Sequence, residues 1–155
     1  MKTYLLAVAL CGWAAVPAQA TTFTYTGAKF DQVSCSARCH FKHFKITIET
    51  AETFGRNGEA QFFPGGGNAT IVSASYSDGQ NSASLADGLN FSGVVLIQGG
   101  KVTSADMEVR VSNSSLALEG FFGTDGTPDQ LSGSAGSLGF NVENTVPGSG
   151  HWKKQ

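Results

Sequence analysis

The segment Phe44–Glu49, which reads FKITIE, carries the clearest hydrophobic pattern in this chain. Phe44, Ile46 and Ile48 fall on one side of an extended backbone, and the three polar residues between and after them fall on the other. A period of two residues is typical of a β-strand with one buried face and one solvated face. The segment therefore predicts a strand that covers a hydrophobic core on one side only.

Segments of the same kind recur along the chain between clusters of turn-forming residues. Residues 70–76 and 81–85 flank Asp78-Gly79, a dipeptide that supplies the positive φ angles of a tight hairpin. A second hairpin is expected from residues 94–97 and 102–111, joined by Gln98-Gly99-Gly100-Lys101. Further strands are expected at residues 22–26, 116–122 and 137–142, the last of these being the final strand.

Two stretches lack this alternation and are expected to be loops. Residues 54–67 end in three consecutive glycines, and residues 123–136 are rich in turn-forming residues. The whole pattern predicts an all-β, single-domain fold of about eight antiparallel strands. The strands could form a β-sandwich of two sheets or a closed β-barrel.

The first twenty residues have the pattern of a secretory signal peptide. Lys2 supplies a basic start, Leu5–Val16 is apolar, and Ala18-Gln19-Ala20 has the small-x-small form of a cleavage site. The apolar run is shorter than the roughly 20 residues that a membrane-spanning helix needs. The sequence therefore predicts a secreted, periplasmic or cell-surface protein with no integral membrane segment after cleavage.

Removal of residues 1–20 leaves 135 of the 155 residues, which is the size of one domain. We expect a β domain over residues 21–146 and a Gly/Ser/Lys tail over residues 147–155. Without Lys2, nine basic side chains remain against twelve acidic ones, and they are spread along the chain. This distribution argues against a nucleic-acid partner, which would require basic clusters.

Cys35, Cys39, His40 and His43 form the one cluster of reactive side chains in the sequence. Cysteine and histidine are the usual ligands of zinc, and Cys-x-x-x-Cys-His also resembles a lengthened haem-attachment motif. An oxidising compartment, however, removes the thiolates that a metal needs. We therefore expect a disulfide between Cys35 and Cys39 and no cofactor, with metal binding by the four residues as the alternative.

Catalytic motifs are not recognisable in the sequence. Several aspartates lie in glycine-containing turns, but they do not have the spacing of an EF-hand calcium loop. The glycine- and serine-rich segments do not match a nucleophile elbow, and no pair of acidic residues is singled out for glycosidase chemistry. We expect a protein that is not an enzyme and assign no catalytic residue.

Four short motifs together resemble a group of uncharacterised bacterial secreted proteins of the PEP-CTERM-associated type. They are Tyr25–Phe30, Ser75–Gly79, Gly100–Ala105 and Pro147–Trp152. Ala105 stands where the group has tryptophan, and the Pro-Glu-Pro sorting tail of the group does not follow Trp152. The resemblance implies an extracellular β-domain and transfers no catalytic residue.

A second, shorter resemblance rests on Glu119–Gly123 followed by Leu131–Gly133. This order is similar to the Gly-x-Phe-x-Gly pattern in the eight-stranded barrels of transferrin-binding-protein-like surface lipoproteins. It implies a barrel that binds a host or environmental protein.

These observations predict a secreted, non-enzymatic β-domain that binds an extracellular protein or glycan, or that serves as a matrix or surface component. One alternative is the surface binding barrel just described. The other is a small secreted hydrolase whose site is assembled from residues far apart in the sequence.

Overall fold

The computed structural model describes residues 20–36, 39–123, 128–136, 138–144, 146, 148 and 150–155. The expected signal peptide, except Ala20, lies outside the described residues. The described strands form two antiparallel sheets, so the all-β prediction is confirmed. This part of the chain contains no helix of the length and hydrophobicity required to span a membrane.

The smaller sheet has five strands in the order β12-β1-β3-β5-β6. Their bounds are His151–Lys154 for β12, Thr21–Thr26 for β1, Lys45–Thr50 for β3, Ile71–Ser77 for β5 and Ser82–Ser84 for β6. A short 3-10 helix, η1 (Leu85–Asp87), follows β6 and leads into the larger sheet.

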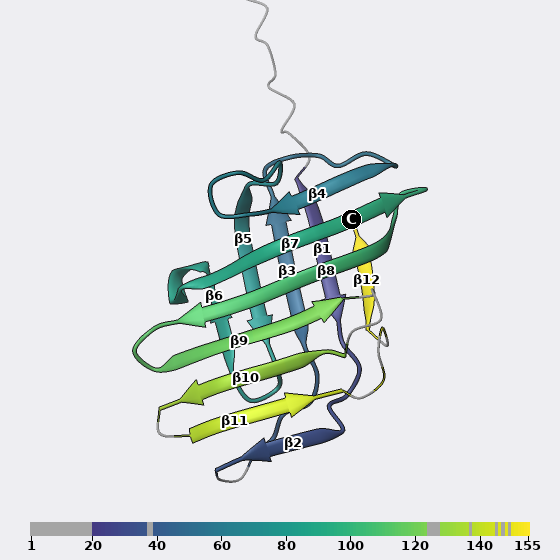
Figure 1. The fold of residues 1–155 in the computed structure, drawn as a ribbon. Coiled ribbons are helices and arrows are strands. Elements are labelled where there is room, and N and C mark those ends of the chain that lie inside the picture. The colour runs from purple at the N-terminus through teal and green to yellow at the C-terminus, as the bar shows by residue number, and fades with distance from the viewer. Residues whose placement is uncertain are drawn as a thin grey trace, which may run out of the picture.

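The larger sheet has seven strands in the order β2-β11-β10-β9-β8-β7-β4. Their bounds are Gln32–Cys35 for β2, Leu138–Glu143 for β11, Gln130–Ala135 for β10, Leu116–Gly123 for β9, Lys101–Ser112 for β8, Leu89–Gln98 for β7 and Gly58–Phe62 for β4. Figure 1 shows this sheet lying across the smaller one, with the strands of the two sheets crossing steeply. Strands cross in this way in orthogonal β-sandwiches.

The core lies between the two sheets and is rich in aromatic rings. Phe44, Ile46 and Ile48 are fully buried, as the alternation predicted. The ring of Phe44 packs 5.7 Å from that of Phe122 on the opposite sheet and 6.0 Å from that of Tyr76. The segment Phe44–Glu49 thus supplies three core side chains and an aromatic contact between the two sheets.

Residues 54–67 were expected to form a loop, and this prediction is wrong for β4. Ala60 and Phe62 are buried, and the strand pairs with β7. The side chain of Asn68 accepts a hydrogen bond from the Gln61 backbone and donates one to the Glu59 carbonyl. The segment after β4 therefore folds back and satisfies backbone groups along the free edge of this strand.

Two further predictions differ from the structure. Residues 123–136 were expected to form a loop, and the strand at residues 137–142 was expected to be the last one. Gln130–Ala135 forms β10, in which Gly133 packs so closely on β9 that an added Cβ would lie 2.3 Å from the Ala117 carbonyl oxygen. His151–Lys154 forms β12, which pairs with β1 inside the segment expected to be a tail. Both strands are short and contain few apolar residues, so period-two alternation does not reveal them.

The described strands number more than the eight expected, and no strand pair joins the two sheets. The sandwich is the alternative that fits this arrangement. Both predicted hairpins are present, as β5–β6 and as β7–β8. The second hairpin turns at Gly99 and Gly100, both of which have positive φ.

Candidate functional site

The reactive cluster seen in the sequence folds at the end of β2. The Sγ atoms of Cys35 and Cys39 lie 2.06 Å apart, which is the length of a disulfide bond, as predicted. His40 is exposed, and its backbone N–H donates a 2.6 Å hydrogen bond to the side chain of Gln80. Among the described residues, no three His, Cys, Asp or Glu side chains are grouped so that they could hold a metal ion.

A different candidate site lies on the solvent-facing side of the seven-stranded sheet, which we call the outer face. One row of side chains crosses five neighbouring strands at a single level. This Phe121 row consists of Ser92, Glu108, Phe121, Gln130 and Glu143. All of its members except Phe121 are polar.

A second polar row lies beside the first. This Arg110 row consists of Asn90, Arg110, Glu119, Ser132 and Asn141. Because side chains alternate along a strand, the residues between the rows point inward, and Phe91, Val109 and Leu131 among them are buried. The core packing therefore holds both rows in fixed positions.

Phe121 is the unusual member of its row because its side chain is 46% exposed. Its neighbour Phe122 points inward and is buried against Tyr25 and Phe44. Two consecutive aromatic residues in a strand face opposite sides, so only one of them can enter the core. The Phe121-Phe122 pair was therefore a sequence signal for an exposed ring, although sequence reasoning did not use it.

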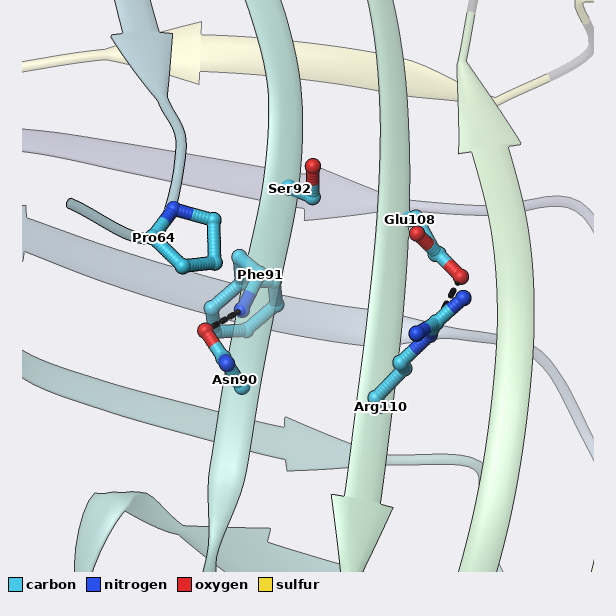
Figure 2. Close-up of a pocket in the computed structure, with 6 residues that line it drawn as sticks. All are labelled: Pro64, Asn90, Phe91, Ser92, Glu108 and Arg110. Atoms are coloured by element: carbon cyan, nitrogen blue, oxygen red, sulfur yellow. Dashed lines mark hydrogen bonds and ion pairs between the residues drawn. The ribbon is translucent and has the colours of Figure 1, made fainter. Parts of the chain in front are cut away.

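A small pocket opens between β7 and β8 where the two rows meet (Figure 2). Its volume is about 130 Å³, close to the roughly 150 Å³ of a protein cavity that holds one benzene ring. The pocket is lined by Pro64, Asn90, Phe91, Ser92, Glu108 and Arg110. It therefore presents amide, hydroxyl, carboxylate and guanidinium groups to a small ligand or to part of a larger one.

Arg110 joins the charges of this face into one network. Its guanidinium lies 2.5 Å from Oε1 of Glu108 and 3.1 Å from Oε1 of Glu119 on β9. The hydrogen bond to Glu108 and the charges of both carboxylates raise the pKa of Arg110. These contacts hold the polar groups in place and leave the face with a net negative charge, because one arginine lies between two glutamates and Glu143 lies in the Phe121 row.

Apart from the outer face, a cluster of polar side chains lies in the interior, where it contributes to the fold. The Tyr25 hydroxyl donates a hydrogen bond to Asp129, while Asp129 Oδ2 and the indole nitrogen of Trp152 are buried without a hydrogen-bond partner among the described residues. Burial raises the pKa of Asp129 to about 6, although hydrogen bonds from Tyr25 and from the Gly123 backbone offset part of the rise. The carboxyl group is 3% exposed and is not available to a ligand on the surface.

A matching pair lies beneath the β5–β6 hairpin. The Tyr76 hydroxyl donates a 2.6 Å hydrogen bond to Asp78, which is fully buried. Asp78 also accepts bonds from the backbone of Gln80 and from both the backbone and the side chain of Asn81. All of these contacts stabilise the hairpin turn.

The exposed groups of the outer face can bind a ligand that offers both hydroxyl groups and an apolar flank. Its donors and acceptors lie beside one exposed aromatic ring, on strands whose inward-facing side chains are buried. Comparison with known proteins returns no match for this chain among protein-family models, curated proteins or solved structures.

Proposed function

We propose that this chain is a secreted, non-enzymatic β-sandwich that binds an uncharged extracellular glycan on the outer face of its seven-stranded sheet. The observation that carries the proposal is the exposed ring of Phe121, which lies in a row of polar side chains. The signal-like sequence of residues 1–20 supports export, which would give the protein access to glycans outside the cell.

The chemistry of a sugar ring matches this face. A pyranose has hydroxyl groups around its rim and C–H groups on its flat sides, so it combines hydrogen bonding with contact to an aromatic ring. Phe121 supplies the apolar platform, while its strand neighbours Glu108 and Gln130 supply acceptors and a donor. The pocket beside Arg110 has room for part of one such ring.

Two features favour a glycan over a protein partner. The centres of protein interfaces are usually apolar and depleted in charged residues. Here the exposed aromatic ring is surrounded by polar and charged side chains, and Arg110 is held by two glutamates. The carboxylates of the two rows outnumber their single cation, Arg110, so the face would repel an acidic polymer and suits an uncharged glycan better.

The proposal can be tested by screening residues 21–155 against an array of neutral oligosaccharides, followed by calorimetry with any that bind. Phe121→Ser is expected to weaken binding about tenfold or more, because the ring provides the apolar contact. Val72→Ser is the matched control, since Val72 is similarly exposed but lies on β5 of the other sheet.

The stability of both variants should stay within about 0.5 kcal/mol of the parent protein because both side chains are exposed. Absence of binding to every neutral glycan would contradict the proposal, as would unchanged affinity in Phe121→Ser. Release of shortened oligosaccharides from a bound glycan would instead support the hydrolase alternative.

A further inference from the structure

Three lysines from two distant parts of the sequence lie around one groove at the edge of the sandwich. Lys101 is the first residue of β8, and Lys153 and Lys154 belong to β12. The groove they line has a volume of about 420 Å³, and Trp152 forms part of its wall. Figure 1 shows β12 (yellow) beside β1 at this edge.

The lysines of β12 are held on a paired strand. Lys153 lies opposite Thr24 and Lys154 opposite Phe23, and Gln155 exchanges backbone hydrogen bonds of 3.0 and 2.9 Å with Thr22. The indole of Trp152 stacks on Phe122 with ring centroids 5.8 Å apart. The backbone positions of these lysines are therefore set before any ligand binds.

The turn between β7 and β8 brings a fourth cation to the same edge. The backbone N–H of Gly100 donates a 2.7 Å hydrogen bond to the carbonyl of Arg56, and Arg56 is exposed. Together with the three lysines, this places four of the ten basic residues of the chain at one corner. We call Arg56, Lys101, Lys153 and Lys154 the basic corner.

The charge of this corner is not balanced within the part of the chain that the structure describes. The two ion pairs found there both involve Arg110 on the outer face. The lysines of the basic corner make no such pair with a described carboxylate, although acidic residues outnumber basic ones in the chain. The corner is therefore a local site of positive potential on an acidic protein.

We propose that the basic corner is a second binding site, which takes an acidic polysaccharide whose sugars carry carboxylate groups. The ammonium groups of Lys101, Lys153 and Lys154 pair with successive carboxylates, and the partly exposed indole of Trp152 offers an apolar surface to the sugar between them. This site is distinct from the outer face, which meets an uncharged ligand in the proposed function.

The distribution of charge favours a polysaccharide over duplex DNA or an anionic membrane. A DNA duplex carries one charge per roughly 1.7 Å of axis, and its binding requires an extended basic surface. The basic corner offers three lysines around one groove and Arg56 on the neighbouring loop, and the rest of the chain carries an excess of acidic side chains. A polymer with one charge per sugar suits such a small number of fixed cations.

The experiment uses residues 21–155 and polygalacturonate oligomers, with fully methyl-esterified oligomers of the same length as the uncharged control. We expect binding of the acid form only, with an affinity that falls as the salt concentration rises. Lys101→Gln, Lys153→Gln and Lys154→Gln should each weaken binding on the order of fivefold, the effect of one basic residue near an anionic surface. Lys45→Gln, an exposed substitution in β3, is the matched control and should bind as the parent does.

Circular dichroism and thermal unfolding would verify that each variant is folded. Failure to bind polygalacturonate would overturn the proposal, as would equal binding of the esterified form or unchanged affinity in a variant that combines the three lysine substitutions. Binding to duplex DNA or to vesicles containing anionic lipid at least as tight as to polygalacturonate would overturn the choice of polysaccharide. Because Phe121→Ser leaves this corner intact, it should bind polygalacturonate normally, which separates this site from the outer face.

Discussion

The Tyr25 hydroxyl lies 2.6 Å from Oδ1 of Asp129, which joins β1 of the smaller sheet to the residue that precedes β10 of the larger one. The two residues are 104 positions apart in the sequence. Tyr25 is fully buried and Asp129 nearly so. This contact links the sheets through a polar bond in the interior, and it makes stability sensitive to protonation.

The raised pKa of Asp129, about 6, predicts a stability that depends on pH. The folded state holds this proton more tightly than the unfolded chain, whose aspartate titrates near 3.9. The protonated carboxyl group therefore contributes its full stabilisation below about pH 4. As pH rises through about 6 this contribution is lost, and the free energy of unfolding falls by up to about 3 kcal/mol. Urea unfolding between pH 4 and 7.5 should show this fall in the free energy of unfolding for the parent protein and not for Asp129→Asn.

Asp106→Asn is a suitable control for that experiment because Asp106 is exposed on β8. Its pH profile of unfolding free energy should parallel that of the parent. An Asp129→Asn profile that also parallels the parent would contradict the assignment of the pH dependence to the buried carboxyl group.

The two buried tyrosines should differ in how much stability they lose when the hydroxyl is removed. Tyr25→Phe leaves a buried carboxyl group without its side-chain donor, which costs about 1–3 kcal/mol. Tyr76→Phe leaves Asp78 with three other donors, so we expect a loss of about 0.5–1.5 kcal/mol. Chemical denaturation at pH 7 gives both values, and an equal or reversed order would be inconsistent with this account.

Gly27 provides the space in which Asp129 lies. A Cβ added at this position would stand 2.4 Å from Asp129 Oδ2, so Gly27→Ala should displace the carboxyl group and lower stability by about 1–3 kcal/mol. Gly139→Ala is the control because its added Cβ has no atom within 4 Å, and it should be neutral or slightly stabilising. Thermal unfolding should give a lower melting temperature for Gly27→Ala than for Gly139→Ala. Similar melting temperatures for the two variants would contradict the close packing of Asp129 on Gly27.

The Cys35–Cys39 bond closes a five-residue loop at the end of β2. In the chain-entropy description a loop of this length contributes about 2 kcal/mol to the free energy of unfolding. Urea denaturation with and without reductant should show a loss of that size in the parent protein. The Cys35→Ser, Cys39→Ser double variant should be insensitive to reductant, and no effect of reductant on the parent would exclude a stabilising disulfide.

Much of the fold could be predicted because its long strands bury alternate side chains. The alternation of Phe44, Ile46 and Ile48 predicted β3, and Asp78-Gly79 predicted the first hairpin. Strands β2, β4, β10 and β12 were missed because they are short and have few apolar side chains, and because some of their residues are dictated by contacts with neighbouring strands. Gly133, for example, is required by the approach of the Ala117 carbonyl, which no local pattern contains.

The candidate site was beyond sequence reasoning for a similar reason. The sequence drew attention to Cys35, Cys39, His40 and His43, and the structure places the two cysteines at bonding distance. The outer face instead assembles one residue from each of several strands, as in the row that contains Ser92, Phe121 and Glu143. Such a row depends on strand register, which is set by long-range pairing.

The pairing of β1 with β12 also has a consequence for the order of folding. Thr21–Thr26 is synthesised near the start of the chain, yet one of its two strand partners is His151–Lys154. One side of β1 stays an open edge, able to recruit other strands, until residues 151–154 have been synthesised. The smaller sheet is therefore completed much later than the β1–β3 pair, whose residues lie close together in the sequence.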